Sequence, residues 1–349
     1  MIETKNIKIG KGNPVFIIAE VGVNHNGDIS KAKELIDAAV EAGVDAVKFQ
    51  TFNTDKLTTK KAPKADYQNE TTDQNESQYE MLKKLELSKE EHIILKEYCE
   101  KKNINFMSTP FSFDTVDLLE EIGVDVYKIG SSDTNNLPLL KYIAQKNKPI
   151  ILSTGMSTLT EVSEAVETIL NTGNDKLVLL HCVSNYPAEY ENVNLKAMDT
   201  MKNAFNIETG YSDHTLGVEV PIAAAARGAV VIEKHFTLDK NMEGPDHKAS
   251  LNPKELENMV QSIRNIKASL GNGIKEPTKN EKKNLITVRK SLVSNKALDK
   301  GSKIKVEDID IKRPGTGIEP KFMDVIKNMK LIRDVKIDQI LSWEDFKIG

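Results

Sequence analysis

The sequence contains few of the features that mark secreted or membrane-spanning proteins. Its 349 residues include two cysteines, Cys99 and Cys182, which are too few for a disulfide framework and favour a reducing, cytoplasmic setting. It contains no run of about 18 continuous apolar residues, so we expect no membrane span. The N-terminal segment is polar and lacks the apolar stretch of a signal peptide. These absences predict a soluble cytoplasmic protein.

The sequence also has little excess charge of either sign. The 48 Lys and Arg residues nearly balance 52 Asp and Glu residues, which gives a formal net charge of −4 at pH 7. A general nucleic-acid binder needs a basic surface, so we expect no nucleic-acid partner. A small basic site for phosphate remains compatible with this balance. Neither the G-x-G-x-x-G nor the Walker A pattern occurs, so the common nucleotide-binding motifs are absent.

Short β-branched runs alternate with amphipathic segments along most of the chain. The predicted strands are residues 15–20, 44–50, 104–108, 126–130, 149–154, 177–181, 207–210 and 230–235. The predicted helices are residues 30–42, 88–102, 113–122, 137–146, 158–171, 195–205, 218–227 and 253–270. Strands separated by helices form right-handed βαβ units and a parallel sheet. Eight such units predict a TIM (β/α)8 barrel, with a doubly wound open sheet as the alternative.

The alternation of strands and helices ends near residue 273, so the predicted barrel domain is 1–273. Residues 274–286 are polar and rich in Lys and Glu, and they predict a linker. Residues 287–349 contain short alternating segments with Gly and Pro turns, which predict a small β-rich domain. Such a small domain has a marginal core of its own, so docking onto a barrel would stabilise it. The long polar loop 51–80 is expected to be a lid or a surface insertion.

Polar side chains follow nearly every predicted strand. The C-terminal strand ends of a TIM barrel form its active site, so these side chains are expected to meet. His214 and His235 follow the seventh and eighth strands, and could bind one divalent metal together with Glu20 and water or a substrate oxygen. Such a donor set suits Mn or Mg. The alternative is two unrelated polar residues.

Two lysines, Lys48 and Lys128, lie near strand ends among Ser and Thr hydroxyls. Lysines in such positions bind an anion or form a Schiff base, and the alternative is that they extend along the barrel rim. Turns with Ser131, Ser153 and Ser212 offer hydroxyls and backbone N–H groups to a phosphate. The combination predicts a phosphorylated or carboxylated substrate.

Among these donors Asp133 is a lone carboxylate and a candidate general acid or base. Its alternative role is that of a turn residue that caps the next helix. His25 and His181 also follow strands, and could equally be hydrogen-bonded structural histidines. His92 falls on a predicted helix, and we expect it at the surface.

Ten motifs carry a resemblance to a known family. They are AEVGVNHNG (19–27), VKFQT (47–51), STPF (108–111), KIGSSDTNN (128–136), LSTGM (152–156), HCVSNYP (181–187), GYSDHT (210–215), EKHFTLDK (233–240), GPDHKASL (244–251) and KRPGTG (312–317). Nearly the whole chain resembles the sialic acid synthase family, which makes nine-carbon nonulosonic acids. Residues 287–349 resemble the antifreeze-like (SAF) domain that this family appends to its barrel.

The resemblance implies a transferase that condenses phosphoenolpyruvate with an N-acyl-mannosamine-type sugar. His214 and His235 match the family's metal ligands, usually for Mn. Phosphoenolpyruvate is implied to bind at Lys48, Lys128, Ser131, Ser153, Ser184 and Ser212. The implied sugar-binding residues are Gln50, Thr109, Tyr186, Asp246 and Arg313.

The resemblance has further implications at a few positions. Asp133 and Glu20 are the candidate catalytic acid–base groups, and Asp133 stands where many bacterial members carry the longer Glu. Ser184 replaces an Asn found in some members. Arg313 matches an arginine that reaches into the barrel of the other copy and touches the sugar's N-acyl group, which implies a domain-swapped homodimer.

The sequence leaves the acceptor sugar open. The first expectation is N-acetylmannosamine, which would give N-acetylneuraminate and phosphate. The alternative is 2,4-diacetamido-2,4,6-trideoxymannose, which would give N,N'-diacetyllegionaminate. A more remote alternative is an aldolase that forms a Schiff base through Lys128.

Overall fold

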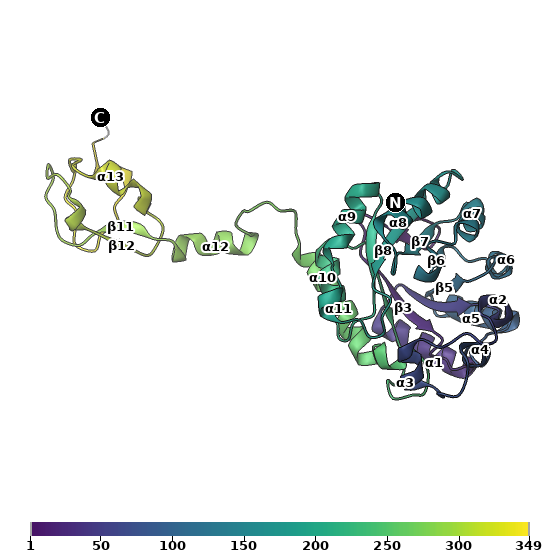
Figure 1. Ribbon diagram of the computed structural model, residues 1–349. Coiled ribbons are helices and arrows are strands. Elements are labelled where there is room, and N and C mark those ends of the chain that lie inside the picture. Colours follow the sequence, from purple (N-terminus) through teal and green to yellow (C-terminus); the bar gives the residue numbers. More distant parts are fainter. Residues whose placement is uncertain (1, 348–349) are drawn as a thin grey trace. The chain divides into compact units, whose positions relative to one another are not determined.

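The structure is a computed structural model that describes residues 2–347. Its internal contacts divide the chain into two units, Met1–Gly271 and Asn272–Gly349 (Figure 1). This division lies two residues before the predicted end of the barrel domain. Among the residues that the structure describes, no helix combines the length and apolarity needed to cross a membrane.

Eight parallel strands form the sheet of the first unit. They are β3 (Phe16–Gly22), β4 (Ala46–Thr51), β5 (Asn105–Pro110), β6 (Tyr127–Ile129), β7 (Ile150–Ser153), β8 (Leu177–Cys182), β9 (Thr209–Asp213) and β10 (Val231–His235). Their order is β5-β4-β3-β10-β9-β8-β7-β6, and the two terminal strands of this order are in contact. The sheet therefore curves into a barrel, which confirms the predicted fold (Figure 1).

Helices follow the strands and cover the outside of the barrel (Figure 1). They are α1 (Ile29–Ala42), α5 (Lys89–Lys101), α6 (Phe113–Ile122), α7 (Leu137–Gln145), α8 (Leu159–Leu170), α9 (Lys196–Phe205), α10 (Glu219–Ala226) and α11 (Pro253–Ser269). Ser88 and Glu91 form a capping box at the start of α5. Helix α1 begins one residue before the predicted Ser30, because the side chain of Asp28 accepts hydrogen bonds from the first backbone N–H groups.

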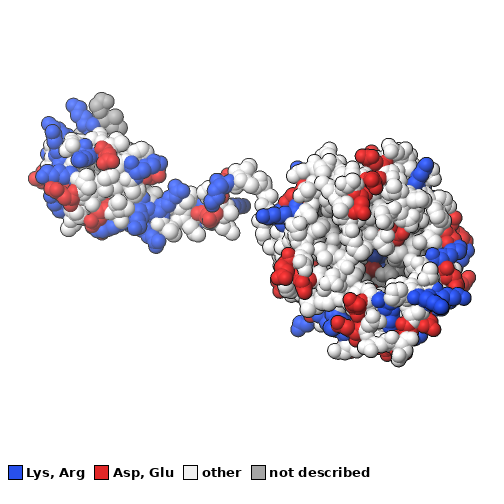
Figure 2. Space-filling model, in the orientation of Figure 1, with Lys and Arg blue, Asp and Glu red and all other residues white. Residues whose placement is uncertain are grey.

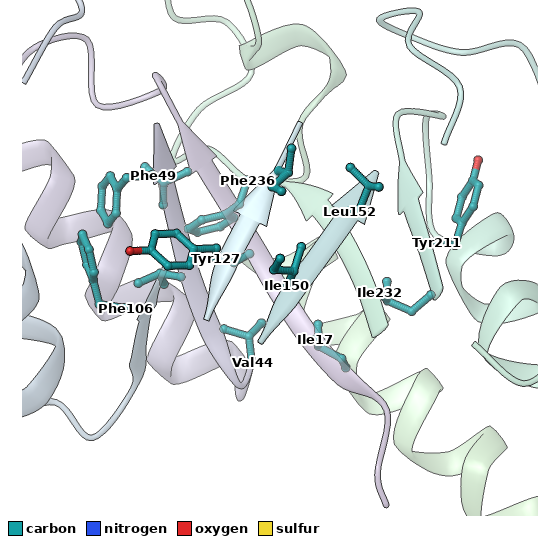
Figure 3. Close-up of a cluster of buried hydrophobic side chains, with 14 of the residues drawn as sticks. Ile17, Val44, Phe49, Phe106, Tyr127, Ile150, Leu152, Tyr211, Ile232 and Phe236 are labelled. Carbon is teal, nitrogen blue, oxygen red and sulfur yellow. The ribbon is translucent and has the colours of Figure 1, made fainter. Parts of the chain in front are cut away.

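Strand side chains alternate between two apolar layers. Ile17, Phe49, Tyr127, Leu152 and Tyr211 belong to the outer layer, between the strands and the surrounding helices (Figure 3). The inner layer fills the N-terminal half of the barrel and is made of Ile2, Ile7, Ile9, Phe16, Ile18, Ala46, Met107, Val126, Ile151, Val178, Leu180, Val230 and Val231. Three of these isoleucines come from the hairpin of β1 (Ile2–Glu3) and β2 (Lys8–Ile9) and its turn.

The period-two alternation also carries polar residues to the inside of the barrel. Val126, directly before β6, and Val231 of β10 belong to the inner layer, and Lys128 and Glu233 come two residues after them. They therefore point to the same side, towards the C-terminal half of the barrel interior.

The long polar segment after β4 is more ordered than the predicted loop. It contains three short helices, α2 (Thr54–Leu57), α3 (Asp66–Thr71) and α4 (Gln78–Lys83). The ammonium group of Lys64 is buried there, where it donates to Thr72 Oγ1 at 2.8 Å and lies 3.7 Å from Glu76 Oε1. These helices are too short and polar to show apolar periodicity, so the sequence pattern did not reveal them.

The second unit has its own core and few regular strands. Its elements are α12 (Lys279–Val288), β11 (Ser291–Ser294), β12 (Ile309–Lys312) and α13 (Met323–Ile326). The antiparallel pair β11–β12 is extended by isolated bridges, and Leu292, Ile304 and Leu341 are among its buried core residues. Helix α12 occupies much of the predicted linker 274–286, so this part of the chain is helical. A capping box of Thr278 and Glu281 begins this exposed, polar helix.

Candidate active site

A cavity of about 410 Å³ lies among the C-terminal ends of the barrel strands. A hollow with charged groups of both signs inside it is visible on the barrel unit in Figure 2. Twelve predicted site residues line the cavity: Glu20, Lys48, Gln50, Thr109, Lys128, Ser131, Ser153, Ser184, Tyr186, Ser212, His214 and His235. The structure therefore brings together residues that are spread over more than 200 positions of the sequence.

Two lysines and two glutamates form an ion-pair network inside the cavity. Lys48 Nζ lies 2.7 Å from Glu20 Oε2 and 3.8 Å from Glu233 Oε2. Lys128 Nζ lies 3.4 Å from Glu233 Oε1. All four side chains are buried, so their charges are stabilised chiefly by one another.

Burial and the neighbouring charges shift the protonation of this network. Burial raises the pKa of Glu20 to about 7, against the opposing effect of Lys48, and the charge of Glu233 raises it further. Burial also tends to raise the pKa of Glu233, but Lys128 and Lys48 hold it below its ordinary value. Burial lowers the pKa of Lys128. Of the two glutamates, Glu20 is therefore the one whose carboxyl group can hold a proton near neutral pH.

Hydroxyl groups surround the two ammonium groups. Lys128 Nζ donates to Ser153 Oγ at 2.7 Å, and Lys48 Nζ donates to Thr109 Oγ1 at 3.0 Å. The backbone N–H of Gly155 donates to Ser131 Oγ at 2.9 Å. This arrangement of cations and hydroxyls suits a small substrate with phosphate and carboxylate groups.

His214 and His235 lie next to each other with ring centroids 5.4 Å apart. His214 Nδ1 contacts the carbonyl oxygen of Val183 at 2.7 Å, which fixes the ring and leaves Nε2 as the free ligand atom. His235 Nδ1 has no hydrogen-bond partner within residues 2–347, and it lies 3.7 Å from Asp246 Oδ2. Burial lowers the pKa of His235 well below its ordinary value, so its imidazole is neutral, as metal binding requires.

The histidine pair fits a divalent ion that takes its other ligands from water or substrate. Over the described part of the chain, no group of three or more His, Cys, Asp and Glu side chains is arranged to hold a metal. Two imidazoles and several oxygen ligands are a donor set that Mn²⁺ accepts. The two histidines are therefore compatible with the expected Mn²⁺ ion. The assignment of this ion stays a proposal.

Two family profiles match most of the chain. The NeuB family profile covers residues 35–275, and the SAF domain profile covers residues 289–347. The chain belongs to the NeuB family. This membership confirms the expected enzyme class, a transferase that condenses phosphoenolpyruvate with a second substrate.

Named relatives of this NeuB-family enzyme are similar over nearly its full length. An N,N'-diacetyllegionaminic acid synthase of Legionella pneumophila is 49% identical over 96% of this chain and 95% of its own. A protein of the same name from Campylobacter jejuni is 48% identical over 93% of this chain and 98% of its own. A crystal structure of an N-acetylneuraminic acid synthetase from Leptospira borgpetersenii has a TM-score of 0.72 and 39% identity, covering 81% of this chain and 94% of that one.

Asp133 does not line the cavity of the NeuB-family barrel. Its buried carboxylate accepts hydrogen bonds from Asn136 Nδ2 at 2.8 Å and from Ser132 Oγ at 3.2 Å. Asn136 in turn caps helix α7, with its side chain accepting from Leu139 N. Asn136, and not Asp133 itself, therefore caps α7, and Asp133 holds the side chain of this cap residue. The role of Asp133 as a catalytic acid or base stays a prediction.

Two further predicted residues also lie outside the cavity lining. Asp246 is buried beside His235, and burial raises its pKa to about 6. Arg313 follows β12 in the second unit, where its side chain is exposed. Their roles in sugar binding stay predictions.

Sequence reasoning missed several cavity residues. Glu233 and Cys182 each come two residues after an inward-facing strand residue and therefore also point into the barrel. The period-two pattern of the strands could have identified both. Cys182 Sγ lies 3.7 Å from His214 Nδ1. Tyr67 and Gln78 come from the segment after β4, and no sequence signal linked them to the site.

The expectation that His92 lies at the surface was wrong. Its side chain is fully buried, with Nε2 2.8 Å from Thr51 Oγ1 and Nδ1 2.8 Å from the carbonyl oxygen of Ser88. Helix α5 presents His92 to the outer side of β4, where Thr51 also contacts Ser108. The residue type alone suggested an exposed position, whereas these partners satisfy the ring inside the protein.

Proposed function

We propose that this NeuB-family enzyme is an N,N'-diacetyllegionaminate synthase. It condenses phosphoenolpyruvate with 2,4-diacetamido-2,4,6-trideoxymannose and releases inorganic phosphate. The names of the Legionella and Campylobacter relatives, at 49% and 48% identity over nearly whole chains, support this acceptor. They favour it over N-acetylmannosamine, which the sequence had suggested first.

The observation that carries the phosphoenolpyruvate site is the pair of buried ammonium groups in one cavity. Lys48 and Lys128 bind the phosphate and carboxylate, and the hydroxyls of Ser131, Ser153 and Ser212 add hydrogen bonds. Holding the enol in one orientation beside the sugar aldehyde contributes several kcal/mol to the rate enhancement.

The reaction forms a bond between carbon 3 of phosphoenolpyruvate and the aldehyde carbon of the open-chain sugar. Water adds at carbon 2, and the resulting tetrahedral intermediate loses phosphate. We assign His214 and His235 as ligands of a divalent ion, Mn²⁺ in preference to Mg²⁺. When bound, such an ion supplies Lewis-acid polarisation of the aldehyde oxygen.

Glu20 is the proposed proton carrier among the cavity side chains. Its pKa of about 7 lets it exchange a proton near neutral pH, and Gln50 Nε2 holds its Oε1 at 3.2 Å. Asp133 would assist only after moving towards the cavity, because it is engaged with Asn136. Sugar contacts are assigned to Gln50, Thr109, Tyr186 and Asp246.

We also propose a cytoplasmic, domain-swapped homodimer in which Arg313 completes the sugar site of the other copy. This assignment rests on the match of the KRPGTG segment to the family's arginine position. Its test is the effect of an Arg313 substitution on the Michaelis constant of the sugar.

The second candidate function is N-acetylneuraminate synthesis from N-acetylmannosamine. The similarity to the Leptospira structure, at 39% identity, favours it. Both functions release phosphate from phosphoenolpyruvate, so the acceptor must be tested directly.

The deciding experiment measures phosphate release with phosphoenolpyruvate and Mn²⁺ in parallel reactions with each sugar. We expect the larger kcat/KM with the diacetamido sugar, and a product whose mass equals that of N,N'-diacetyllegionaminate. A larger kcat/KM with N-acetylmannosamine would support the second candidate instead. Trapping of pyruvate on Lys128 by borohydride would indicate the Schiff-base aldolase.

The metal assignment has its own test. His235→Ala should abolish metal-dependent phosphate release and weaken Mn²⁺ binding in a calorimetric titration. Unchanged turnover and unchanged Mn²⁺ binding would contradict the assignment of His235 as a ligand.

A further inference from the structure

The segment that follows β10 leaves the barrel at the histidine pair and returns to the same place. The backbone N–H of Leu251 donates to the carbonyl oxygen of His235 at 2.8 Å, and that of Thr237 donates to the carbonyl oxygen of Leu251 at 2.9 Å. Residues 236–251 therefore form a closed loop whose two ends lie beside the last residue of β10. Asp246 lies on this loop, with its Oδ2 3.7 Å from His235 Nδ1.

Asn24 holds both ends of the 236–251 loop. Its side chain, which belongs to the AEVGVNHNG motif, is fully buried. The amide nitrogen donates to the carbonyl oxygen of Phe236 at 2.8 Å and to Ser250 Oγ at 2.9 Å. Ser250 Oγ in turn donates to the carbonyl oxygen of Asp246 at 2.7 Å. Two successive hydrogen bonds therefore connect Asn24 to the backbone of Asp246.

The direction of these hydrogen bonds follows from the groups involved. The carbonyl oxygens of Phe236 and Asp246 can only accept, so Asn24 presents its Nδ2 and Ser250 directs its single hydrogen to Asp246. Asn24 Oδ1 is buried and has no hydrogen-bond partner within residues 2–347. A buried oxygen without a partner costs free energy, so Asn24 contributes less to stability than a fully paired amide would. What Asn24 provides is a fixed orientation of the two ends of the loop.

The position of Asp246 decides what lies behind the imidazole of His235. At 3.7 Å, Asp246 Oδ2 lies slightly beyond hydrogen-bond distance from His235 Nδ1. A displacement of about 1 Å therefore decides whether this carboxylate can orient the ring. A carboxylate behind a ligating imidazole fixes the orientation of the ring and strengthens its binding to the ion.

We propose that Asn24 is a positioning residue that, through Ser250, holds the Asp246 carboxylate beside His235 and so strengthens the binding of a divalent ion by the histidine pair. Asn24 and Ser250 lie outside the cavity lining, so they act through Asp246 and not by contact with a substrate. This inference rests on the metal site of the proposed function.

The test is a calorimetric titration of the full-length protein with Mn²⁺. It compares the wild type with Asn24→Ala, Ser250→Ala and the double variant that carries both changes. Asn26→Ala is the matched control, because Asn26 also donates to the 236–251 loop, at 2.9 Å, but its partners there are Glu243 and His247. Urea unfolding of each variant measures the change in stability separately.

We expect Asn24→Ala and Ser250→Ala each to weaken Mn²⁺ binding about tenfold. The double variant should bind no more weakly than either single variant, because both changes break the same connection. Asn26→Ala should bind Mn²⁺ as the wild type does, whatever its loss of stability. In an Asp246→Asn background, Asn24→Ala should weaken binding no further. If Asn24→Ala does not fold, Ser250→Ala decides between the outcomes.

The inference is overturned if the folded Asn24 and Ser250 variants bind Mn²⁺ as tightly as the wild type, or if Asn26→Ala weakens binding equally. It is also overturned if the two losses add in the double variant, or if Asn24→Ala still weakens binding tenfold in the Asp246→Asn background. Failure of the proposed metal site has a different signature, since the wild type itself would then bind no Mn²⁺, and the inference would fall with it.

Discussion

The ion pair of Asp213 and Lys234 lies on the outer side of the barrel, directly behind the histidine pair. Both side chains have no exposed surface, and the two residues face each other across β9 and β10. Lys234 Nζ donates to Asp213 and, at 2.5 Å, to the carbonyl oxygen of Thr215. Thr215 Oγ1 donates to Asp213 Oδ1 at 2.9 Å, so the pair also fixes the turn that contains His214.

Replacing Asp213 by Asn should be strongly destabilising. The amide can still accept the hydrogen bonds from Thr215, but the ammonium group of Lys234 loses its counter-charge at a position with no exposed surface. Removing one partner of a buried pair typically costs about 3–5 kcal/mol of unfolding free energy. The double variant Asp213→Asn with Lys234→Met removes both charges and should recover much of this loss, because the Met side chain fills the volume of the lysine stem.

Urea unfolding followed by circular dichroism measures these differences. The exposed pair of Asp199 and Arg227, whose side chains are 48% and 37% exposed, supplies the control. Asp199→Asn should cost less than about 1 kcal/mol, because water stabilises the unpaired arginine. The reasoning is refuted if Asp213→Asn costs no more than Asp199→Asn, or if the double variant is as unstable as Asp213→Asn alone.

Three further changes test other parts of the structure. Gly155→Ala would place a Cβ atom 2.3 Å from Ser184 Oγ, so we expect a raised KM for phosphoenolpyruvate with little change in the KM of the sugar; equal changes in both would contradict this. Burial lowers the pKa of His25 to about 4, and its Nδ1 accepts a hydrogen bond from Gly27 N, so the folded protein should lose about 3 kcal/mol of stability as the pH falls from about 6.5 to about 4. Thermal unfolding measured across this pH range should show a smaller loss of stability for His25→Asn than for the wild type. Equal losses in both proteins would contradict the lowered pKa of His25. Arg313→Ala should mainly raise the KM of the sugar, and an unchanged KM in steady-state assays would count against the proposed contact from the other copy.

The strands and helices of the barrel followed from local patterns. Short β-branched runs identified the strands, and amphipathic segments identified the helices, because both signals depend on residues close together in the sequence. The polar residues after the strands then pointed to one site, since parallel strands in a barrel end at the same rim. This is why twelve predicted residues, Lys48 and His235 among them, line one cavity.

Other features had no local signal. Helices α3 and α4 are short and polar, and the stack of Tyr67 on Tyr186 joins residues that are 119 positions apart. The exposure expected for His92 was wrong because its partner Thr51 lies on a different element. Contacts between residues that are distant in the sequence depend on the tertiary structure. The periodicity of apolar residues along the sequence does not predict them.

The amino-acid sequence thus contained the order of the elements, the barrel and the chemical character of its rim, because alternation and capping are encoded in neighbouring residues. Closure of the barrel decided which groups pair inside it. It put Glu233 of β10 between Lys48 of β4 and Lys128 of β6. Charges on separate strands acquire their partners and protonation only after the strands pack together and exclude water, so these properties belong to the tertiary structure.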